Sequence, residues 1–147
     1  MLDRKILDKI IPSLAAVGLL DASYLFYEHI HQGRILFCVD PNGCNQVLQS
    51  QYAEISSVPV ALLGMVFYFS ILFLSLFLIK KRESLSRKLL AALGLVGFGT
   101  SVCLVYLMLG VIKALCGFCL LSALLSTLIF VFSTINLRLK KQEKLDF

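Results

Sequence analysis

The sequence predicts an all-α integral membrane protein, built as a bundle of four transmembrane helices. Of its 147 residues, 59% are hydrophobic and only 16% are charged, and the mean hydropathy is +0.87. A soluble domain carries about 25% charged residues, and a core of this size would not shield so much apolar surface from water. Four apolar stretches reach the roughly 20 residues that cross a bilayer. We therefore expect the whole chain, 1–147, to form a single membrane domain.

The predicted spans cover residues 10–27, 58–79, 89–110 and 115–135, and they leave a loop at 28–57. The first span is the least regular because it contains Asp21. A cleavable signal peptide is the alternative for this segment. The apolar run continues past Asp21 through the letters YLFY, and no convincing small-x-small cleavage site follows, which favours a retained span.

The distribution of basic residues predicts the orientation. Twelve of the 14 Lys and Arg residues lie at the N-terminus, between the second and third spans, or in the C-terminal tail. The other two are Arg34 and Lys113. By the positive-inside rule, both termini are cytoplasmic, and the loop 28–57 faces the extracytoplasmic side, as does the turn before Leu115. Because the basic residues cluster at span ends, the net charge of +5 does not indicate a nucleic-acid partner.

Two pairs of cysteines fall on the predicted extracytoplasmic side, where disulfides persist. Cys38 and Cys44 lie in the loop, and Cys116 and Cys119 occupy the first turn of the last span. The letters DPNG between Cys38 and Cys44 suit a type I turn that folds the chain back. The fifth cysteine, Cys103, lies inside the third span, and we interpret it as a small buried hydrophobe.

The CGFC motif has the features of a reactive dithiol. Residues three apart share one face of a helix, and the N–H groups of a helix N-terminus favour a thiolate. Cys119 is expected about 4.5 Å deeper in the bilayer than Cys116, since a helix rises about 1.5 Å per residue. We therefore expect Cys116 to meet thiols from the loop and Cys119 to face a lipid-soluble oxidant.

A zinc site is another interpretation of these cysteines. Two Cys pairs supply four thiolates, and His29 and His31 are near in sequence. The spacing of Cys38 and Cys44 exceeds that of the usual ligand pair, and the pairs flank a membrane in an oxidising compartment. We therefore predict no metal site.

The segment that follows Cys44 is amphipathic. The letters NQVLQSQYAEI place four apolar residues on one helical stripe: Val47, Leu48, Tyr52 and Ile55. The segment is too short to span a bilayer, so we predict a short half-helix in the extracytoplasmic loop that lies on the membrane interface. Such a helix would cover the end where Cys116 and Cys119 lie. An ordinary surface helix is the alternative.

Asp21 and several aromatic residues are the remaining candidates. An ionisable residue inside a span is costly and often functional, so Asp21 is a candidate for a proton path. The alternative is a structural Asp that is hydrogen-bonded to Ser23, Tyr106 or another span. Phe118 is a candidate for binding a cofactor, although aromatic residues in spans more often pack. The same applies to three residues of the second span: Phe67, Tyr68 and Phe69.

The ordered set of motifs resembles the vitamin K epoxide reductase family over nearly the whole chain. Its elements are CVDPNGC, the pattern C-x-x-V-x-x-S that ends at Ser50, the letters SSVPVALLGMVFY, and CGFC at the start of the last span. A lone C-x-x-C is weak evidence, whereas this ordered combination is specific. The likeness is to the bacterial branch, which oxidises protein thiols.

The resemblance implies a four-helix bundle around a quinone, either ubiquinone or menaquinone, in the bacterial inner membrane. By position, Cys119 would react with the quinone, Cys116 would exchange with Cys44, and Cys38 would contact a thioredoxin-like partner. Ser50 would match the small hydroxyl residue near the redox centre. Many bacterial relatives carry a fused thioredoxin-like domain that this chain lacks, so we expect a separate partner of the DsbA type.

Two departures from the family pattern bear on the reaction. The enzymes that reduce vitamin K have an Asn in the second span and a Tyr one turn after the last Cys, where this chain has Val60 and Ala123. These differences favour quinone-dependent disulfide formation. DsbB-type enzymes do the same chemistry, but their C-x-x-C motif lies in the first extracytoplasmic loop. In this chain the motif opens the last span, which disfavours that family. The other hypotheses are a non-enzymatic assembly protein with structural disulfides and a zinc- or copper-binding membrane protein.

Overall fold

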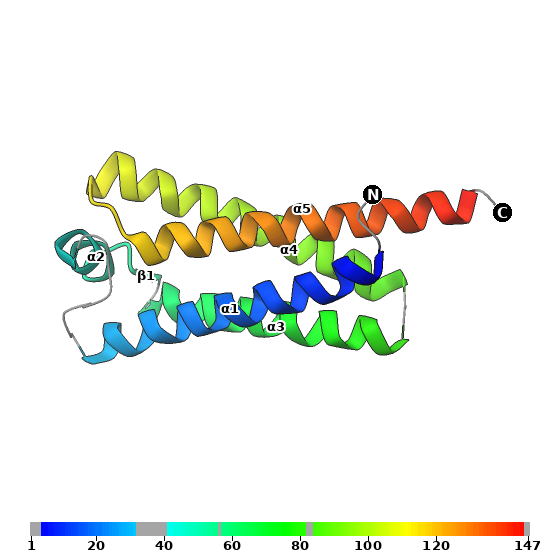
Figure 1. Ribbon diagram of the computed structural model, residues 1–147. Helices are drawn as coiled ribbons and strands as arrows, with labels where there is room; N and C mark the ends of the chain where they lie inside the picture. Colours follow the sequence, from blue (N-terminus) through cyan, green and yellow to red (C-terminus); the bar gives the residue numbers. More distant parts are fainter. Residues whose placement is uncertain (1–3, 32–40, 56, 82–83, 146–147) are drawn as a thin grey trace.

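The computed structural model describes residues 4–31, 41–55, 57–81 and 84–145. Four long helices run along an elongated bundle: α1 (Arg4–His31), α3 (Val60–Lys81), α4 (Ser84–Tyr106) and α5 (Gly117–Leu145) (Figure 1). Each contains a stretch that is long and apolar enough to cross a membrane, with α4 extended by the π-helical turn η1 (Leu107–Ile112). The predicted all-α membrane bundle is confirmed.

The bundle is closed by packing between neighbouring helices. The helix α1 packs against α3 and α5, and α4 packs against α5 and α3. Glycine permits close approach at two points, because a Cβ on Gly18 or Gly97 would lie 2.3 Å from the ring of Tyr68 or Phe67, respectively. The central core contains eight buried residues: Ile11, Ala15, Ala22, Tyr68, Ile71, Leu90, Leu125 and Ile129.

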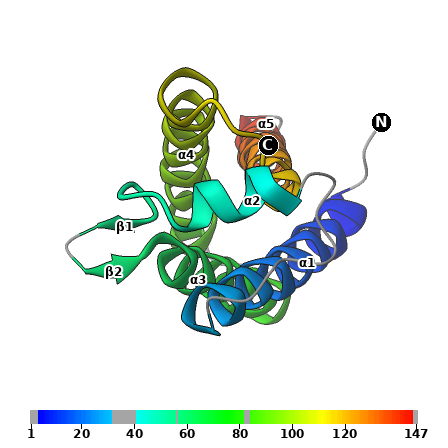
Figure 2. The same cartoon turned by 90° about the vertical axis from the view of Figure 1, so that its left-hand side faces the viewer.

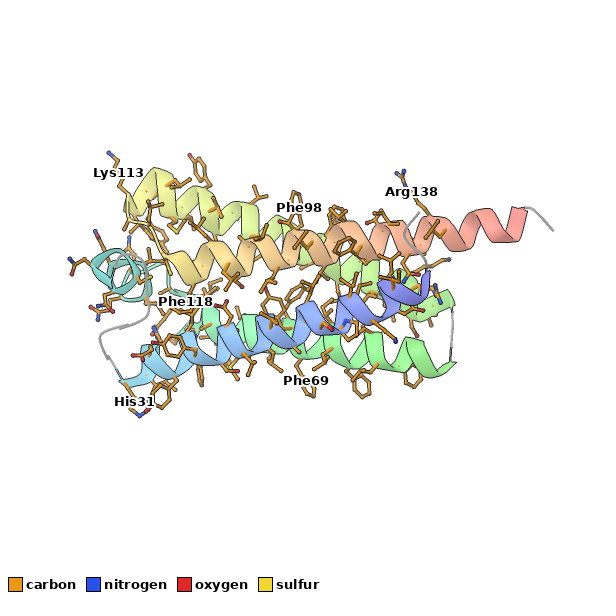
Figure 3. All side chains as sticks on the ribbon, in the orientation of Figure 1. His31, Phe69, Phe98, Lys113, Phe118 and Arg138 are labelled. Carbon is orange, nitrogen blue, oxygen red and sulfur yellow. The ribbon has the colours of Figure 1, made fainter. Side chains whose placement is uncertain are left out.

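The outer surface of the bundle is apolar. Leu20, Phe69 and Phe73 are 72%, 59% and 62% exposed, and Phe69 points away from the bundle (Figure 3). Soluble proteins rarely expose contiguous apolar surface of this extent. The exposed side chains therefore suit contact with lipid acyl chains along the length of the helices.

A short cap covers one end of the bundle. It comprises α2 (Pro41–Leu48) and two antiparallel strands, β1 (Glu54–Ile55) and β2 (Val58–Pro59). We use the word cap for the described residues of 41–59. Figure 2 shows α2 lying across the end of the four long helices, with the strand pair projecting beside it. In the connection between the strands, Ser57 has a left-handed backbone conformation, with φ of 68°.

The cap differs from its prediction in two respects. The half-helix begins at Pro41 and ends at Leu48, whereas the amphipathic stripe predicted a helix after Cys44. Proline suits the first turn of a helix, and type I turn dihedrals are close to helical ones, so the expected DPNG turn continues as α2 from Pro41. The second difference is the β1–β2 pair, which replaces the last part of the predicted helix.

The opposite end of the bundle contains a buried polar network. Arg87 Nη1 donates a hydrogen bond to Asn136 Oδ1 at 2.5 Å, and Asn136 Nδ2 donates to Asp8 Oδ1 at 2.9 Å. Arg87 and Asn136 are both buried. The network connects α1, α4 and α5 where α1 begins.

Candidate active site

Two cysteines are completely buried in one hydrophobic cluster at the cap end. Cys44 lies on α2, and Cys116 is the residue directly before α5. The other buried residues of the cluster are Leu25 and Met108. Cys44 is in a disulfide, whereas Cys116 and Cys119 are free thiols. The prediction that Cys103 is buried is wrong, because this free thiol is exposed on the outer surface of α4. Cys38 lies outside the described residues. The fold therefore brings the loop cysteine Cys44 and the CGFC motif into one cluster.

The π-helical turn η1 positions Cys116. The backbone N–H groups of Lys113 and Ala114 both donate to the carbonyl oxygen of Met108. The N–H of Cys116 donates to Met108 Sδ at 3.4 Å. Lys113 takes up a left-handed conformation, with φ of 54°, and this reverses the chain between η1 and α5. A wide π turn is rare and typical of functional sites.

Hydrogen bonds to its sulfur favour the thiolate of Cys116. The bond from the Cys119 side chain is the largest cause that lowers the pKa of the Cys116 thiol, and burial opposes it. The backbone N–H groups of Cys119 and Phe118 lower this pKa further, and the first of them lies 3.3 Å from Cys116 Sγ. Cys116 directly precedes the membrane-spanning stretch of α5. It therefore combines burial with the N-terminal N–H groups of a helix.

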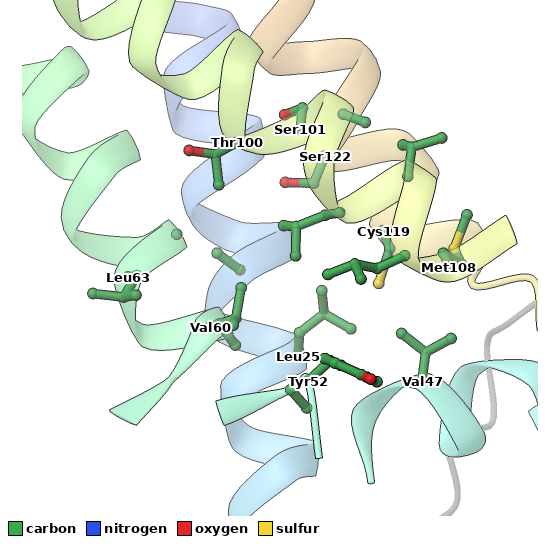
Figure 4. A pocket seen from close by; sticks show the side chains of 18 of the residues that line it. Leu25, Val47, Tyr52, Val60, Leu63, Thr100, Ser101, Met108, Cys119 and Ser122 are labelled. Carbon is green, nitrogen blue, oxygen red and sulfur yellow. The ribbon is translucent and has the colours of Figure 1, made fainter. Parts of the chain in front are cut away.

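Cys119 opens onto a cavity of about 430 Å³ beneath the cap. Its sulfur points into the space between Val47, Tyr52 and Met108 (Figure 4). The walls come from all four long helices, η1 and the cap, and most of the side chains are aliphatic or aromatic. A few polar groups interrupt the apolar lining: His29, Ser50, Thr100, Ser101, Cys119, Ser122 and Ser126. An apolar cavity of this size with a few polar groups is typical of a small-molecule site.

The amphipathic segment of the cap forms the roof of this cavity. The side chains of the predicted stripe all line it: Val47, Leu48, Tyr52 and Ile55. Ser50 lines it as well, and its Oγ donates to the carbonyl oxygen of Val47 at 2.7 Å. Val60 and Ala123, the two positions that depart from the family pattern, also lie on the cavity wall.

The aromatic candidates separate into three groups. Phe67 and Tyr68 line the cavity, and Phe69 faces outward. Phe118 is not among the described residues of the lining, because its ring packs on Tyr24 with centroids 5.2 Å apart. It belongs instead to the cluster around Cys44 and Cys116. The cavity therefore does not support a cofactor contact for Phe118.

Asp21 is buried beside the cavity, and neither carboxylate oxygen has a hydrogen-bond partner among the described residues. Of the structural partners predicted for it, Ser23 donates to the carbonyl oxygen of Leu19, and Tyr106 is 70% exposed. Ser122 on α5 is the neighbour from another span that interacts with the carboxyl group. Asp21 lies close enough to Tyr68, Cys116 and Cys119 to interact with them electrostatically.

A hydrogen-bonded pair lies between Asp21 and the cavity. Tyr68 Oη donates to the carbonyl oxygen of Ser122 at 2.8 Å and lies 2.9 Å from Ser122 Oγ. Both residues line the cavity, and Ser122 also interacts with the Asp21 carboxyl group. The sequence analysis missed Ser122, although its position three residues after Cys119 places it on the same helix face.

The two histidines are placed differently. His29 Nδ1 lies 3.1 Å from the carbonyl oxygen of Leu48, and Nε2 lies 3.1 Å from Glu54 Oε1. His31 Nδ1 lies 3.0 Å from the carbonyl oxygen of Tyr27, one turn earlier in the same helix. His29 thus connects α1 to the cap.

In the part of the chain that the structure describes, no group of three His, Cys, Asp or Glu side chains is arranged to bind a metal ion.

Residues 9–134 of the chain match the sequence model of the vitamin K epoxide reductase family. The match includes α3, α4, the cap and the CGFC motif in full, and most of α1 and α5. Enzymes of this family exchange electrons between thiols and a quinone. The chain therefore belongs to the vitamin K epoxide reductase family, and it is a multi-pass membrane oxidoreductase that links thiols to a quinone.

Proposed function

We propose that this protein forms disulfides in a separate, extracytoplasmic thioredoxin-like partner of the DsbA type and passes the electrons to a membrane quinone. One arrangement carries the proposal. Cys44 and Cys116 are both fully buried in one cluster, and Cys119, one turn along from Cys116, packs against this cluster and also opens onto the apolar cavity. A relay that carries electrons from a water-exposed dithiol to a membrane quinone needs two adjacent cysteines. One sulfur must reach the loop cysteine, and the other must reach the quinone.

The proposed electron route has two thiol–disulfide exchanges. The partner dithiol attacks the Cys38–Cys44 disulfide at Cys38 and leaves as a disulfide, which transfers two electrons and two protons to Cys38 and Cys44. The Cys44 thiolate then attacks Cys116 in the Cys116–Cys119 disulfide and releases the Cys119 thiolate. Closure of Cys38–Cys44 leaves Cys116 and Cys119 reduced. The lowered pKa of Cys116 suits it to be the leaving thiol in later exchange.

The cavity fits ubiquinone or menaquinone. When bound, the quinone supplies the electron acceptor, which takes up two electrons and two protons. Aliphatic residues and Phe67 would pack against its ring, and Ser50 and Thr100 would supply polar contacts. Val60 and Ala123 offer only apolar surface at the positions where vitamin K reductases have Asn and Tyr. This wall supports disulfide formation, and not epoxide reduction, as the reaction.

Asp21 is the proposed proton acceptor of the site. A buried ionisable group without a hydrogen-bond partner is costly inside a span and typical of function. In the proposal, the Asp21 carboxyl group takes up a proton that leaves the dithiol when the Cys116–Cys119 disulfide closes, and it returns that proton toward the cavity, where quinone reduction consumes two protons. Ser122 and Tyr68 provide the path from Asp21 to the cavity, since their hydroxyl groups are hydrogen-bonded to each other.

The proposed location is the bacterial inner membrane, with the cap on the extracytoplasmic side. Basic residues support this orientation, because Lys9 near the start of α1, Arg87 and Lys88 near the start of α4, and Arg138 on α5 lie toward the end opposite the cap. Lys113 lies at the cap end (Figure 3). The start of α1 and the end of α5 both lie at the end of the bundle away from the cap, on the proposed cytoplasmic side (Figure 1).

The test uses purified protein that is reduced and then freed of reductant. Adding an excess of ubiquinone or menaquinone should yield two quinols per protein, because the Cys38/Cys44 and Cys116/Cys119 dithiols each supply two electrons. Cys119→Ala should yield none, and the control Cys103→Ala should match the wild type, since Cys103 is an exposed free thiol on α4. If folded wild-type protein with accessible thiols reduces no quinone, the proposal is wrong and a structural or metal-binding role gains support.

A further inference from the structure

We infer that His29 is a positioning residue that fastens the cap over the cavity, and that it does so fully only when both ring nitrogens carry protons. The inference rests on the proposed function, because the cavity beneath the cap is the proposed quinone site. It concerns how the site is closed and how closure responds to pH, neither of which follows from the electron route.

The ring of His29 bridges three elements. It projects from the last turns of α1, and its two nitrogens reach the carbonyl oxygen of Leu48 at the end of α2 and the carboxylate of Glu54 on β1. The His29 side chain is only 17% exposed. It lines the apolar cavity and also a second, more open cavity of about 690 Å³ between α1 and the cap. Opening the cap would break both bonds.

The chemistry of the two partners sets the protonation that the bridge requires. A carbonyl oxygen and an ionised carboxylate only accept hydrogen bonds, so each ring nitrogen must donate. A neutral imidazole carries a single N–H and can make only one of the two bonds. The imidazolium makes both, and the bond to Glu54 then joins opposite charges. The bridge is therefore complete only when both ring nitrogens carry protons, and it is incomplete when the ring is neutral.

Few other groups near His29 change charge. Glu28 on α1 and Glu54 on β1 line the more open cavity. The end of α2 and the turn after it present only neutral polar groups there: Asn45, Gln49, Ser50 and Gln51. Across the apolar cavity, the titratable groups are Tyr52 from the cap, Tyr68 from α3 and Cys119 from α5. Among the described residues 4–31, 41–55, 57–81 and 84–145, no Lys or Arg lines either cavity.

The test compares the full-length wild type with His29→Gln and with the matched control His31→Gln. Glutamine keeps at most one of the two bonds at any pH, as the neutral ring does. His31 has its bond within α1 and stacks on Tyr27, so His31→Gln leaves the cap untouched. The first readout is the KM for ubiquinone or menaquinone at about pH 5.5 and about pH 8, on either side of the usual histidine range.

The expected KM of His29→Gln exceeds that of the wild type about three- to fivefold at the lower pH, in line with one partly exposed ion pair. At the higher pH the two proteins should agree within about 1.5-fold. Thiol ionisation also changes the rates with pH, but it cancels in this ratio because the proteins share the same cysteines. His31→Gln should match the wild type at both values.

Glu54→Gln provides a second variant with the opposite expectation. The amide can accept from a protonated ring or donate to a neutral one, so both bonds persist at either pH. Glu54 is half-exposed, and the change should not affect folding. The KM of this variant should therefore vary less between the two pH values than that of the wild type.

Amide hydrogen exchange of residues 48–60 gives a readout that needs no quinone turnover. At the lower pH, exchange in this segment should be faster in His29→Gln than in His31→Gln, and the two should agree at the higher pH. Equal exchange and equal KM at the lower pH would overturn the inference. A difference of the same size at both pH values would also overturn it, because His29 would then act by packing alone. If no protein turned over quinone, the proposed function would fail while the exchange data still decided the role of His29.

Discussion

The two ends of the bundle bury polar side chains in different ways. At the end opposite the cap, Arg87, Asn136 and Asp8 are joined by hydrogen bonds across three helices. At the cap end, the buried Asp21 has no hydrogen-bond partner among the described residues, and Cys116 and Cys119 are free thiols. Connected polar networks specify how helices pack, whereas a buried ionisable group without a partner is costly and is typically kept for function. The comparison indicates that one end holds the helices together and the other does chemistry.

The largest expected effect tests which cysteines meet at the cap end. In the double variant Cys38→Ala/Cys119→Ala, mild oxidation should form a disulfide between Cys44 and Cys116 in most molecules, because both sulfurs lie in the same buried cluster. In Cys38→Ala/Cys116→Ala, the remaining Cys119 faces the cavity, so little crosslink with Cys44 should form. Mass mapping of non-reduced peptides measures both yields. A higher yield in the second variant would reverse the proposed order of the relay.

The next effect concerns the opposite end. Asn136→Ala removes the residue that joins Arg87 to Asp8, and it should lower the free energy of unfolding by about 3 kcal/mol, because buried polar partners lose their bonds. Thr134→Val is the control, since its hydroxyl bonds only within α5, to the carbonyl oxygen of Phe130. Denaturant unfolding in micelles measures both variants. The rate of quinone reduction per folded molecule should change less than about twofold, and a large loss of that rate would show that this network is not only structural.

The last prediction, with the smallest expected change in free energy, compares substitutions of two aspartates, Asp21 and Asp8. Asp21→Asn should slow quinone reduction about 100-fold, the typical loss of a general acid or base. Stability should stay close to that of the wild type, because the Asn amide oxygen can still accept from Ser122, the polar neighbour of the Asp21 carboxyl group. Asp8→Asn keeps an oxygen that can accept from Asn136, so its rate should stay at the wild-type level. Stopped-flow kinetics and thermal unfolding measure the two quantities. Equal rates for both variants would remove Asp21 from the mechanism and leave its burial unexplained.

Local patterns predicted the parts of this molecule that depend on local physics. Apolar length is a property of each segment alone, and so the four spans appear in the structure close to where hydropathy placed them. The stripe of the cap was predicted from spacing, and its side chains do line the cavity although the helix itself ends earlier, at Leu48. Spacing fixes which side chains share a face, but it does not determine where a helix gives way to a turn and a strand pair.

Contacts between segments explain what spacing could not predict. Phe118 lies between Cys116 and Cys119, yet its ring turns toward Tyr24 on α1 and away from the cavity. The partners of His29 are 19 and 25 residues away, and the contact of Asn136 with Asp8 crosses 128 residues. No local period encodes such pairs, because they depend on which helices pack together and at what rotation.

The sequence by itself determined that the chain has four segments long and apolar enough to span a membrane and that it carries the motifs of a thiol-oxidising family, and it predicts that Cys119 lies deeper than Cys116. These features follow from additive hydropathy and from the rise of a helix. Only the tertiary structure decided that Cys44 and Cys116 share a cluster, that Cys119 opens onto a cavity, and that His29 joins α1 to the cap. The physical reason is that close packing brings distant segments together, and a bond or a cavity exists only after several of them have met.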